Sequence, residues 1–507
     1  MSTLALRSLR RTFNIIFMVF FLALATSCGR KISVTGSIEG YPEIFPDYAG
    51  VTIPSNIAPL NFSFLGEEPA TLIVSGKSGE RQIKGRKGLF SFPTRYWRKL
   101  MAENAGASIS LTVAVRQDGK WLAFNPFTIN VSSDKIDPFL SFRLIPPGYQ
   151  AWKRLGIYQR NLETYSQTAI FENSLTGGNC VNCHSYCQRD PSKMLFHARG
   201  DFGGTAMILD DKVEKLNTKT DSTISALVYP YWHPSGRYVA FSVNKTNQNF
   251  FSHNENRIEV YDSASDVVVY DVDKHEISWS PLTRSKDSFE TFPTFSPDGR
   301  SLYFCSAKAV SPMPQEYSKA KYSLCRIDFN PEDASFGEKV DTLYNGFKNG
   351  KSVSFPRISP DGRFLVFTLQ EYGNFSIWHK DADLWAADLA SGESFPLEAA
   401  NSEDVDSYHS WSGNSRWLVF SSRRMDGLYT RPFFCHIDGN GQASKPFLLP
   451  QKNPLRYYAD QMNSYNLPEL MERKATVNPH DIASALRNTP GTDVRVRKPL
   501  ITCQMAP

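Results

Sequence analysis

The chain has 507 residues, of which 13% are aromatic, with 31 Gly, 31 Pro and only 8 Cys. Its 56 Lys and Arg nearly balance 51 Asp and Glu, for a net charge of +5, and no basic patch is interleaved with aromatics, which excludes nucleic acid as an expected partner. The aromatic, Gly and Pro content is typical of an all-β protein rich in turns, and the cysteines are too sparse for a disulfide framework.

Residues 1–27 predict a signal peptide. Three arginines precede an apolar run over residues 13–24, and Ala-Thr-Ser follows directly before Cys28. The run is shorter than the about 20 apolar residues that span a bilayer. A cysteine after small residues is typical of a bacterial lipobox, so we expect Cys28 to become a lipid-bearing N-terminus; an ordinary signal peptide is the alternative. The chain is then an exported lipoprotein on the periplasmic side of the envelope, anchored to a membrane, with the outer membrane as the expected location.

Residues 29–150 alternate apolar and polar positions between turn signals, which predicts a β-sandwich-like domain. A short helix is expected over 93–101, with Pro93 in its first turn. Residues 151–176 read as a helical or irregular connector. The clearest expected strands are 71–74, 108–115 and 127–131.

The segment Cys180-Val-Asn-Cys183-His184 carries the strongest chemical signal. C-x-x-C-H is the spacing at which two thiols join the vinyl groups of one haem while the adjacent histidine reaches the iron. We therefore expect one covalent haem c, bound through Cys180 and Cys183, with His184 as an axial ligand of the iron. Export supports this expectation, because c-type haems are matured outside the cytoplasm and a cytosolic redox or zinc role becomes less expected.

A repeat runs through the second half of the chain. Each copy places an apolar residue before a Pro-Asp-Gly type of turn, and then a strand that ends in Phe. The spacing leaves room for a four-stranded blade in each repeat, so residues 211–450 predict a β-propeller of five or six blades. The copies are 231–241, 294–304, 357–367 and 410–420, and the fourth has Gly-Asn-Ser in its turn.

These segments resemble the β-propeller repeats of the TolB family over roughly residues 190–450, a resemblance of fold that does not extend to chemistry. The segment 178–205, with C-V-N-C-H-S and F-H-x-R-G-x-x-G-G-T, also resembles a family of bacterial TolB-like propeller lipoproteins that bear a cytochrome c haem signature. That resemblance implies the same haem site as the motif itself. Residues 177–210 would then hold a haem-binding loop, inserted at the turn that opens the first blade, and the first-blade strands.

The repeat also favours a second axial ligand. Laid on the repeat, residues 190–197 place His197 where the other copies have Phe, and such a break of a local pattern is typical of functional sites. We therefore expect ligation by His184 and His197. Met194 and Met207 are the alternatives, and an open sixth position is a third possibility.

The predicted function is electron transfer or redox sensing outside the cytoplasm, with a redox or envelope protein as partner. The alternative is a TolB-like interaction scaffold whose cysteine loop is structural, closed by a disulfide or by zinc on Cys180, Cys183, Cys187 and a histidine. A haem enzyme would need the open sixth position. No hydrolase, P-loop or Rossmann motif is present, so an enzyme is the less expected class.

Residues 451–507 are expected to be a tail with two short helices. Cys305 and Cys325 fall on neighbouring predicted strands, where either a disulfide or two buried free thiols would be consistent with the pattern.

Overall fold

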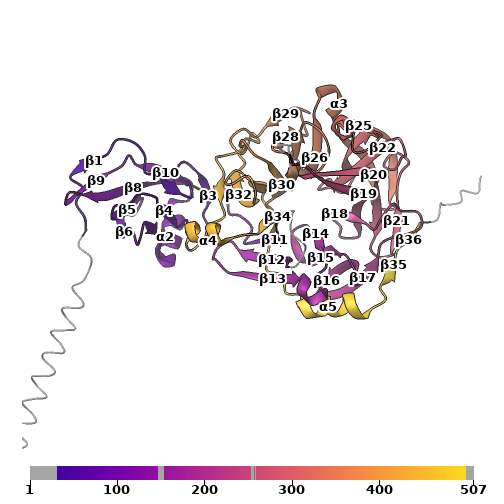
Figure 1. Cartoon of the computed structure of the whole chain (residues 1–507), viewed down its shortest axis with the longest axis horizontal. Helices are drawn as coiled ribbons and strands as arrows, with labels where there is room; N and C mark the ends of the chain where they lie inside the picture. Colours follow the sequence, from indigo (N-terminus) through magenta and orange to yellow (C-terminus); the bar gives the residue numbers. More distant parts are fainter. Residues whose placement is uncertain (1–30, 147–153, 253–255, 257, 498–507) are drawn as a thin grey trace, which may run out of the picture.

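The computed structural model describes residues 31–146, 154–252, 256 and 258–497; the predicted signal segment, Cys28 and Cys503 lie outside these residues. Six β-sheets form a ring around a central axis, and a smaller two-sheet region stands at one side of it (Figure 1). Helices are few and short, so the chain is an all-β, propeller-like protein. In the described part of the chain, no helix is both long and apolar enough to cross a membrane.

The two-sheet region precedes the ring in sequence. Its helix, α2 (Thr94–Asn104), lies where a helix over 93–101 is expected, but Pro93 precedes the helix and the helix ends three residues later than expected. The three clearest expected strands are found in β5, β8 and β10. Its larger sheet contains β1 (Gly36–Ser37), β9 (Lys120–Ala123), β8 (Ala107–Gln117), β10 (Phe127–Ser132), β3 (Thr52–Pro54), β5 (Ala70–Gly76) and β6 (Gly79–Lys84). Its smaller sheet contains β2 (Ile44–Phe45), β4 (Phe62–Phe64) and β7 (Leu89–Phe90).

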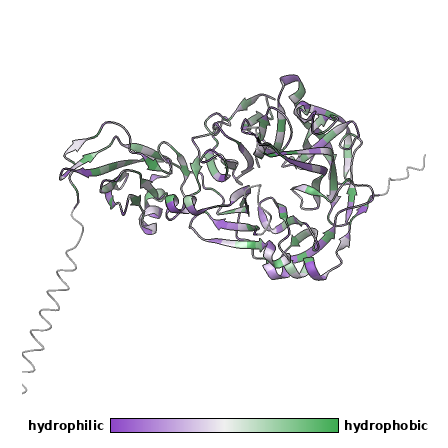
Figure 2. Cartoon of the chain, in the orientation of Figure 1, coloured by the Kyte–Doolittle hydropathy of each residue, from purple (hydrophilic) through white to green (hydrophobic). Residues whose placement is uncertain are grey.

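The ring consists of six antiparallel blades, numbered here in chain order. The strands over residues 364–370 and 417–422 are buried at every position, because both faces of a blade pack on its neighbours, and hydrophobic residues are found throughout the ring (Figure 2). Blade 1 contains β11 (Phe139–Ile145), β12 (Gly156–Asn161), β13 (Gln167–Glu172) and β34 (Ser464–Met471). Blade 2 contains β14 (Val181–Cys187), β15 (Asp190–Ala198), β16 (Gly204–Leu209) and β17 (Lys212–Asn217), with β35 (Thr492–Asp493) on its edge. Blade 3 contains β18 (Val228–Trp232), β19 (Tyr238–Phe250), β20 (Ile258–Asp271) and β21 (Glu276–Ser278), with β36 (Arg495–Val496) on its edge.

The remaining three blades come from consecutive segments of the chain. Blade 4 contains β22 (Ser288–Phe295), β23 (Ser301–Lys308), β24 (Ser323–Asn330) and β25 (Ser335–Tyr344). Blade 5 contains β26 (Ser352–Ile358), β27 (Phe364–Gln370), β28 (Asp383–Asp388) and β29 (Ser394–Pro396). Blade 6 contains β30 (Asp406–Trp411), β31 (Trp417–Ser422), β32 (Arg431–His436) and β33 (Phe447–Leu448). The other elements are η1 (Asn173–Thr176), η2 (Tyr317–Lys319), α3 (Gly346–Asn349), η3 (Ser376–Trp378), α4 (Pro454–Asp460) and α5 (Pro479–Asn488).

Strand β34 closes the ring. The innermost strands β14, β18, β22, β26, β30 and β34 contact one another in that order, and β34 also contacts β14. β34 pairs antiparallel with β11, so segments from the beginning and the end of the propeller sequence build blade 1. The expected tail after residue 451 therefore supplies an innermost strand, and the expected connector 151–176 supplies β12 and β13. Pairing the terminal strands removes the open sheet edges that an unclosed ring would expose.

A ladder of phenylalanines occupies one equivalent position on the strand next to the innermost one in every blade. The equivalence follows from strand pairing. In each blade, the residue two places after the bulge of the innermost strand pairs with a residue of the next strand, and the phenylalanine comes directly after that partner. All six are nearly fully buried. They are Phe142, Phe196, Phe241, Phe304, Phe367 and Phe420.

This register corrects two expectations for blade 2. Phe196, and not His197, takes the position of the repeat phenylalanine, because the β14–β15 hairpin holds one extra residue, accommodated by a second register shift between Tyr186 and Cys187. The haem motif is also not a loop inserted at a turn. It lies mostly on β14, the innermost strand of blade 2.

Candidate functional site

Each innermost strand contains one residue with a left-handed backbone, at a bulge where pairing with the next strand shifts register. A left-handed residue other than glycine costs roughly 1–2 kcal/mol, and its occurrence in all six blades makes it a property of the fold. Five other residues therefore have the same strained backbone conformation as Cys183, and only the thiol side chain distinguishes Cys183 from them. The six residues are Cys183, Tyr229, Phe292, Phe355, Tyr408 and Leu467, with φ from 47° to 56°.

Blade 2 departs from the other blades in both residues at this bulge. Four blades place an aromatic ring there, and neighbouring rings pack, with centroids 4.9 Å apart for Tyr229 and Phe292 and also for Phe355 and Tyr408. The next residue is proline in four blades and histidine only in blades 2 and 6. Cys183 and His184 thus replace an aromatic–proline pair beside the axis. The residues that follow the bulge are His184, Pro230, Pro293, Pro356, His409 and Pro468.

The two thiols of the motif lie near each other and are reduced. Cys180 is 5% exposed and Cys183 4% exposed, and neither forms a disulfide. Burial raises the pKa of the Cys183 thiol, the Tyr229 backbone and Arg199 oppose that shift, and the nearby Cys180 adds to it. Cys183 is therefore a neutral thiol at neutral pH.

His184 is buried and neutral. Burial, together with the positive charge of Arg143, lowers the pKa of His184 to about 3. Among the described residues, neither ring nitrogen has a hydrogen-bond partner of good geometry, although the Leu467 backbone lies close enough to act on the ring. A buried polar atom without a partner is uncommon and calls for an explanation.

The proposed second ligands lie on opposite faces of blade 2. His197 faces blade 3, and burial lowers its pKa to about 4. Its Nδ1 is 3.4 Å from the hydroxyl of Thr205, which lies on the neighbouring strand β16 of blade 2. Met207 lies on the same side, in the core between blades 2 and 3. Met194 packs on the other side, against blade 1. No described contact joins His184 to any of these residues, so the identity of a second ligand stays a prediction.

The other cysteines among the described residues form no metal site. Cys187 packs between blades 2 and 3 with its thiol 3.7 Å from the His233 carbonyl oxygen. Cys305 and Cys325 are both free thiols, which decides between the two expectations for them. In the part of the chain that the structure describes, no three His, Cys, Asp or Glu side chains are grouped so that they could hold a metal ion.

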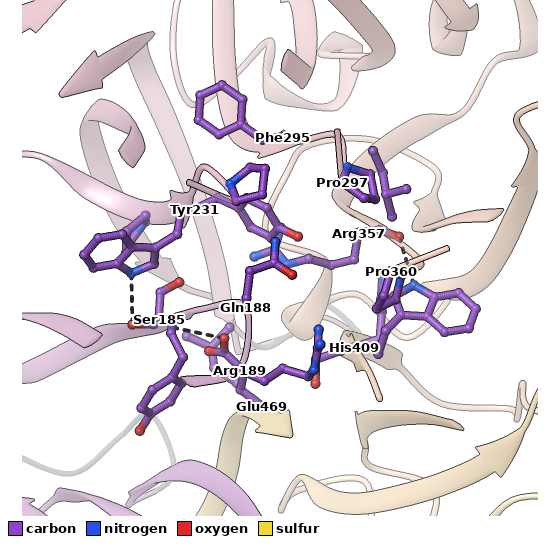
Figure 3. Close-up of a pocket in the computed structure, with 18 of the residues that line it drawn as sticks. Ser185, Gln188, Arg189, Tyr231, Phe295, Pro297, Arg357, Pro360, His409 and Glu469 are labelled. Carbon is purple, nitrogen blue, oxygen red and sulfur yellow. Dashed lines mark hydrogen bonds between the residues drawn. The ribbon is translucent and has the colours of Figure 1, made fainter. Parts of the chain in front are cut away.

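A pocket on the propeller axis was not predicted from the sequence. It has a volume of about 100 Å³ and is lined by residues that follow the bulges of several innermost strands (Figure 3). Aromatic side chains and prolines make up half of its lining, and charged and polar side chains make up most of the rest. The polar lining includes His184, Ser185, Arg189, Arg357, His409 and Glu469.

Opposite charges face this axial pocket without forming an ion pair with each other. Burial raises the pKa of Glu469 to about 7, although the Tyr186 N–H, 3.1 Å from its Oε1, and the charges of Arg357 and Arg189 oppose the shift. Burial also lowers the pKa of Arg357. The sequence carried a signal for the pocket: the residue two places after each bulge varies widely in chemistry while the fold around it repeats.

No family model and no curated protein matches the chain. Among solved structures, it is similar to an oligogalacturonate lyase in complex with manganese (12% identity, TM-score 0.36, covering 61% of this chain and 73% of that one). It is also similar to prolyl oligopeptidase B from Galerina marginata (9% identity, TM-score 0.35, covering 67% and 43%) and to an endo-arabinase from Bacteroides thetaiotaomicron (12%, 0.22, covering 63% and 95%). The chain thus spans less than half the length of that oligopeptidase.

Proposed function

We propose that the protein carries one c-type haem on β14 and serves in electron transfer or redox sensing outside the cytoplasm. The observation that supports this most is the local replacement at the bulge of blade 2: a cysteine and a neutral histidine without a well-formed hydrogen bond stand where three blades have an aromatic–proline pair. A second thiol, Cys180, lies beside the first.

The residues present fit the donor set of such a group. Cys180 and Cys183 would hold it through thioethers, which form when each S–H adds across a vinyl group, and both thiols are in the reduced state that this addition needs. His184 offers an imidazole nitrogen with no hydrogen-bond partner of good geometry among the described residues. Gly178 precedes the motif with φ of 84° and no atom within 4 Å of where a side chain would begin, so the backbone there leaves open space. When bound, a haem supplies a one-electron redox couple.

Production of the protein with haem-attachment machinery tests the proposal. We expect an absorption spectrum with a sharp reduced α band that survives denaturation, and its loss in a Cys180→Ala, Cys183→Ala double variant. Cys187→Ala is the matched control, because it removes a buried thiol from the same strand and should keep the covalent haem.

A wild-type protein that matures without covalent haem would overturn the proposal and leave the interaction scaffold as the function to pursue. His197→Ala examines the second ligand: an unchanged low-spin spectrum would remove His197 from that role.

The export, lipid anchor at Cys28 and envelope location belong to the same proposal, and radiolabelled palmitate incorporation that disappears in Cys28→Ala tests them.

A further inference from the structure

Arg357 projects a half-buried positive charge into the axial pocket. Its Nη1 donates to its neighbour's backbone oxygen, that of Pro356, at 2.8 Å. Its guanidinium lies 3.9 Å from the ring centroid of Phe355 and 5.0 Å from that of Tyr231. Among the described residues, no carboxylate oxygen lies within 4.0 Å of it. A half-buried charge with no ionic partner in contact is costly for a fold, and Glu469 acts on this one only from a distance, so an anion bound in the pocket would stabilise it.

Other donors and acceptors with unused capacity surround the same hollow. The His409 Nε2 bonds the Val366 carbonyl oxygen at 2.8 Å and therefore carries the proton, which leaves Nδ1 as a bare acceptor without a partner. The Arg189 Nε also lacks a hydrogen bond, and its nearest carboxylate, that of Asp137, is 3.9 Å away. Figure 3 shows Arg357, Arg189 and His409 around one space.

The walls of the pocket set the size and character of a ligand. Tyr231 and Phe295 supply flat apolar surface, and the volume of about 100 Å³ is smaller than the roughly 150 Å³ cavity that holds benzene in another protein. A compact molecule with an apolar body and one anionic end matches these features.

We infer that the axial pocket binds a short-chain organic carboxylate, with the carboxylate on Arg357 and the apolar body against Tyr231. A carboxylate accepts two parallel N–H groups from a guanidinium, a geometry that a neutral amide does not reproduce. Arg357 and Tyr231 take no part in the proposed haem attachment, but His184 lines the same pocket, so binding is measured on protein produced without haem and its outcome does not depend on the haem proposal.

Saturation-transfer NMR with propionate tests the inference, with propionamide, alanine and inorganic phosphate as comparison probes. We expect propionate to bind and propionamide not to bind. Arg357→Gln should weaken propionate binding at least tenfold, and Arg357→Lys should weaken it less. Arg326→Gln removes an arginine from an ion pair with Asp341 on blade 4 and should leave binding unchanged.

Three outcomes would overturn the inference. Equal binding of propionamide would mean that the charge plays no part, and preferential binding of alanine would assign the pocket to a zwitterion that also uses Glu469. Phosphate binding as strong as propionate binding would make it a general anion pocket. Circular dichroism and the thermal midpoint of each variant separate lost binding from lost folding, and the covalent haem content should be the same in all variants when they are produced with haem.

Discussion

At the scale of single residues, Glu469 couples the axial pocket to pH. The residue is enclosed by Arg357 on β26, Arg189 in the β14–β15 turn, and the neutral histidines His184 and His409. Burial raises the pKa of Glu469 to about 7 in the folded protein. In the unfolded chain, the carboxyl group releases its proton near the ordinary pKa of Glu. The folded state therefore binds more protons between these values, and this group's contribution to stability falls as pH rises through 7.

Urea unfolding at pH 5, 6, 7 and 8 measures this coupling. We expect the free energy of unfolding to fall by roughly 2–3 kcal/mol over the range on account of Glu469. Glu469→Gln should remove that part of the slope. Glu290, whose pKa is also raised to about 7, contributes in the same direction in both proteins, so the difference between the two slopes isolates Glu469. Equal slopes would contradict the expected coupling.

The phenylalanine ladder gives a second residue-scale prediction, made for the protein without haem. Phe196→Ala removes a fully buried ring and should cost about 3–5 kcal/mol of unfolding free energy. His197→Ala removes a side chain whose one described hydrogen bond is long, at 3.4 Å, and should cost about 1 kcal/mol. Denaturant titration of both variants checks the order, and a larger loss for His197 would restore the register expected from the sequence.

At the scale of elements, the sequence predicted the strands whose turns carry distinctive residues. Gly236, Gly299 and Gly362 all have φ near 74° in the turns that the Pro-Asp/Ser-Gly pattern marks. Blade 2 turns instead through Gln188 and Arg189, both left-handed, in a two-residue turn without proline or glycine. The repeat pattern contained no sign of the extra residue in the β14–β15 hairpin. The predicted register therefore placed His197, one residue after Phe196, at the phenylalanine position.

Blade 1 and the pocket could not be predicted either, and the physical reason is a different one. β34 pairs with β11 across more than 300 residues of chain, and no local periodicity records which distant strand a strand will join. The axial pocket likewise takes single residues from several strands. The C-x-x-C-H signal was local, so it could be found, but the placement of its side chains depends on neighbouring blades.

The closing role of β34 leads to a prediction about truncation. A chain that ends at Pro450 lacks the innermost strand of blade 1 and exposes β11, β30 and β14 along the axis, so we expect it to be insoluble or molten. A chain that ends at Val477 keeps β34 and loses only α5 and the two edge strands, so it should stay folded with reduced stability. Near-ultraviolet circular dichroism compares the two chains. Equal folding of both would show that β34 is dispensable.

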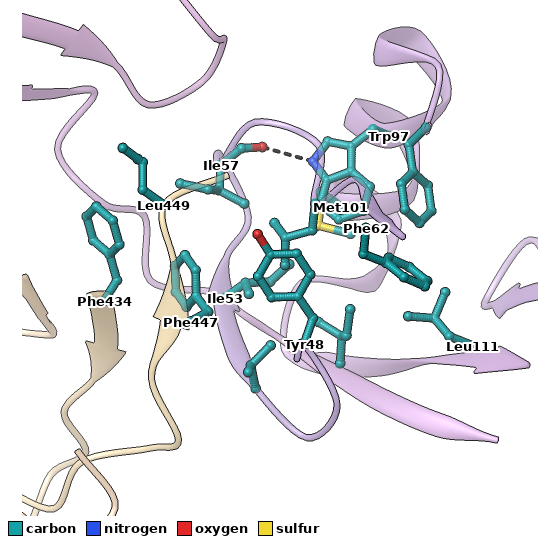
Figure 4. Packing of buried hydrophobic residues seen from close by; sticks show 14 of the residues in the cluster. Tyr48, Ile53, Ile57, Phe62, Trp97, Met101, Leu111, Phe434, Phe447 and Leu449 are labelled. Carbon is teal, nitrogen blue, oxygen red and sulfur yellow. Dashed lines mark hydrogen bonds between the residues drawn. The ribbon is translucent and has the colours of Figure 1, made fainter. Parts of the chain in front are cut away.

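At the scale of the whole molecule, the two-sheet region and the ring share one hydrophobic core. Tyr48 and Trp97 of the first region belong to the same buried cluster as Phe434 and Phe447 of blade 6 (Figure 4). Polar contacts reinforce the junction: the Tyr48 hydroxyl donates to the Leu448 carbonyl oxygen at 3.2 Å. A boundary of this kind is unlike a flexible linker, because separating the parts would expose apolar surface on both.

We therefore expect the two-sheet region and blade 6 to unfold as one cooperative unit. Phe447→Ala should cost about 3–5 kcal/mol and lower protection from hydrogen exchange in β8 and β10 as well as in β31 and β32. Phe329→Ala, which removes a buried ring from the core between blades 3 and 4, is the matched control and should leave exchange in β8 and β10 unchanged below the global unfolding limit. Hydrogen exchange read by mass spectrometry resolves these segments. If Phe447→Ala loosens only blade 6, the two parts are independent domains that merely touch, and the shared core does not couple them.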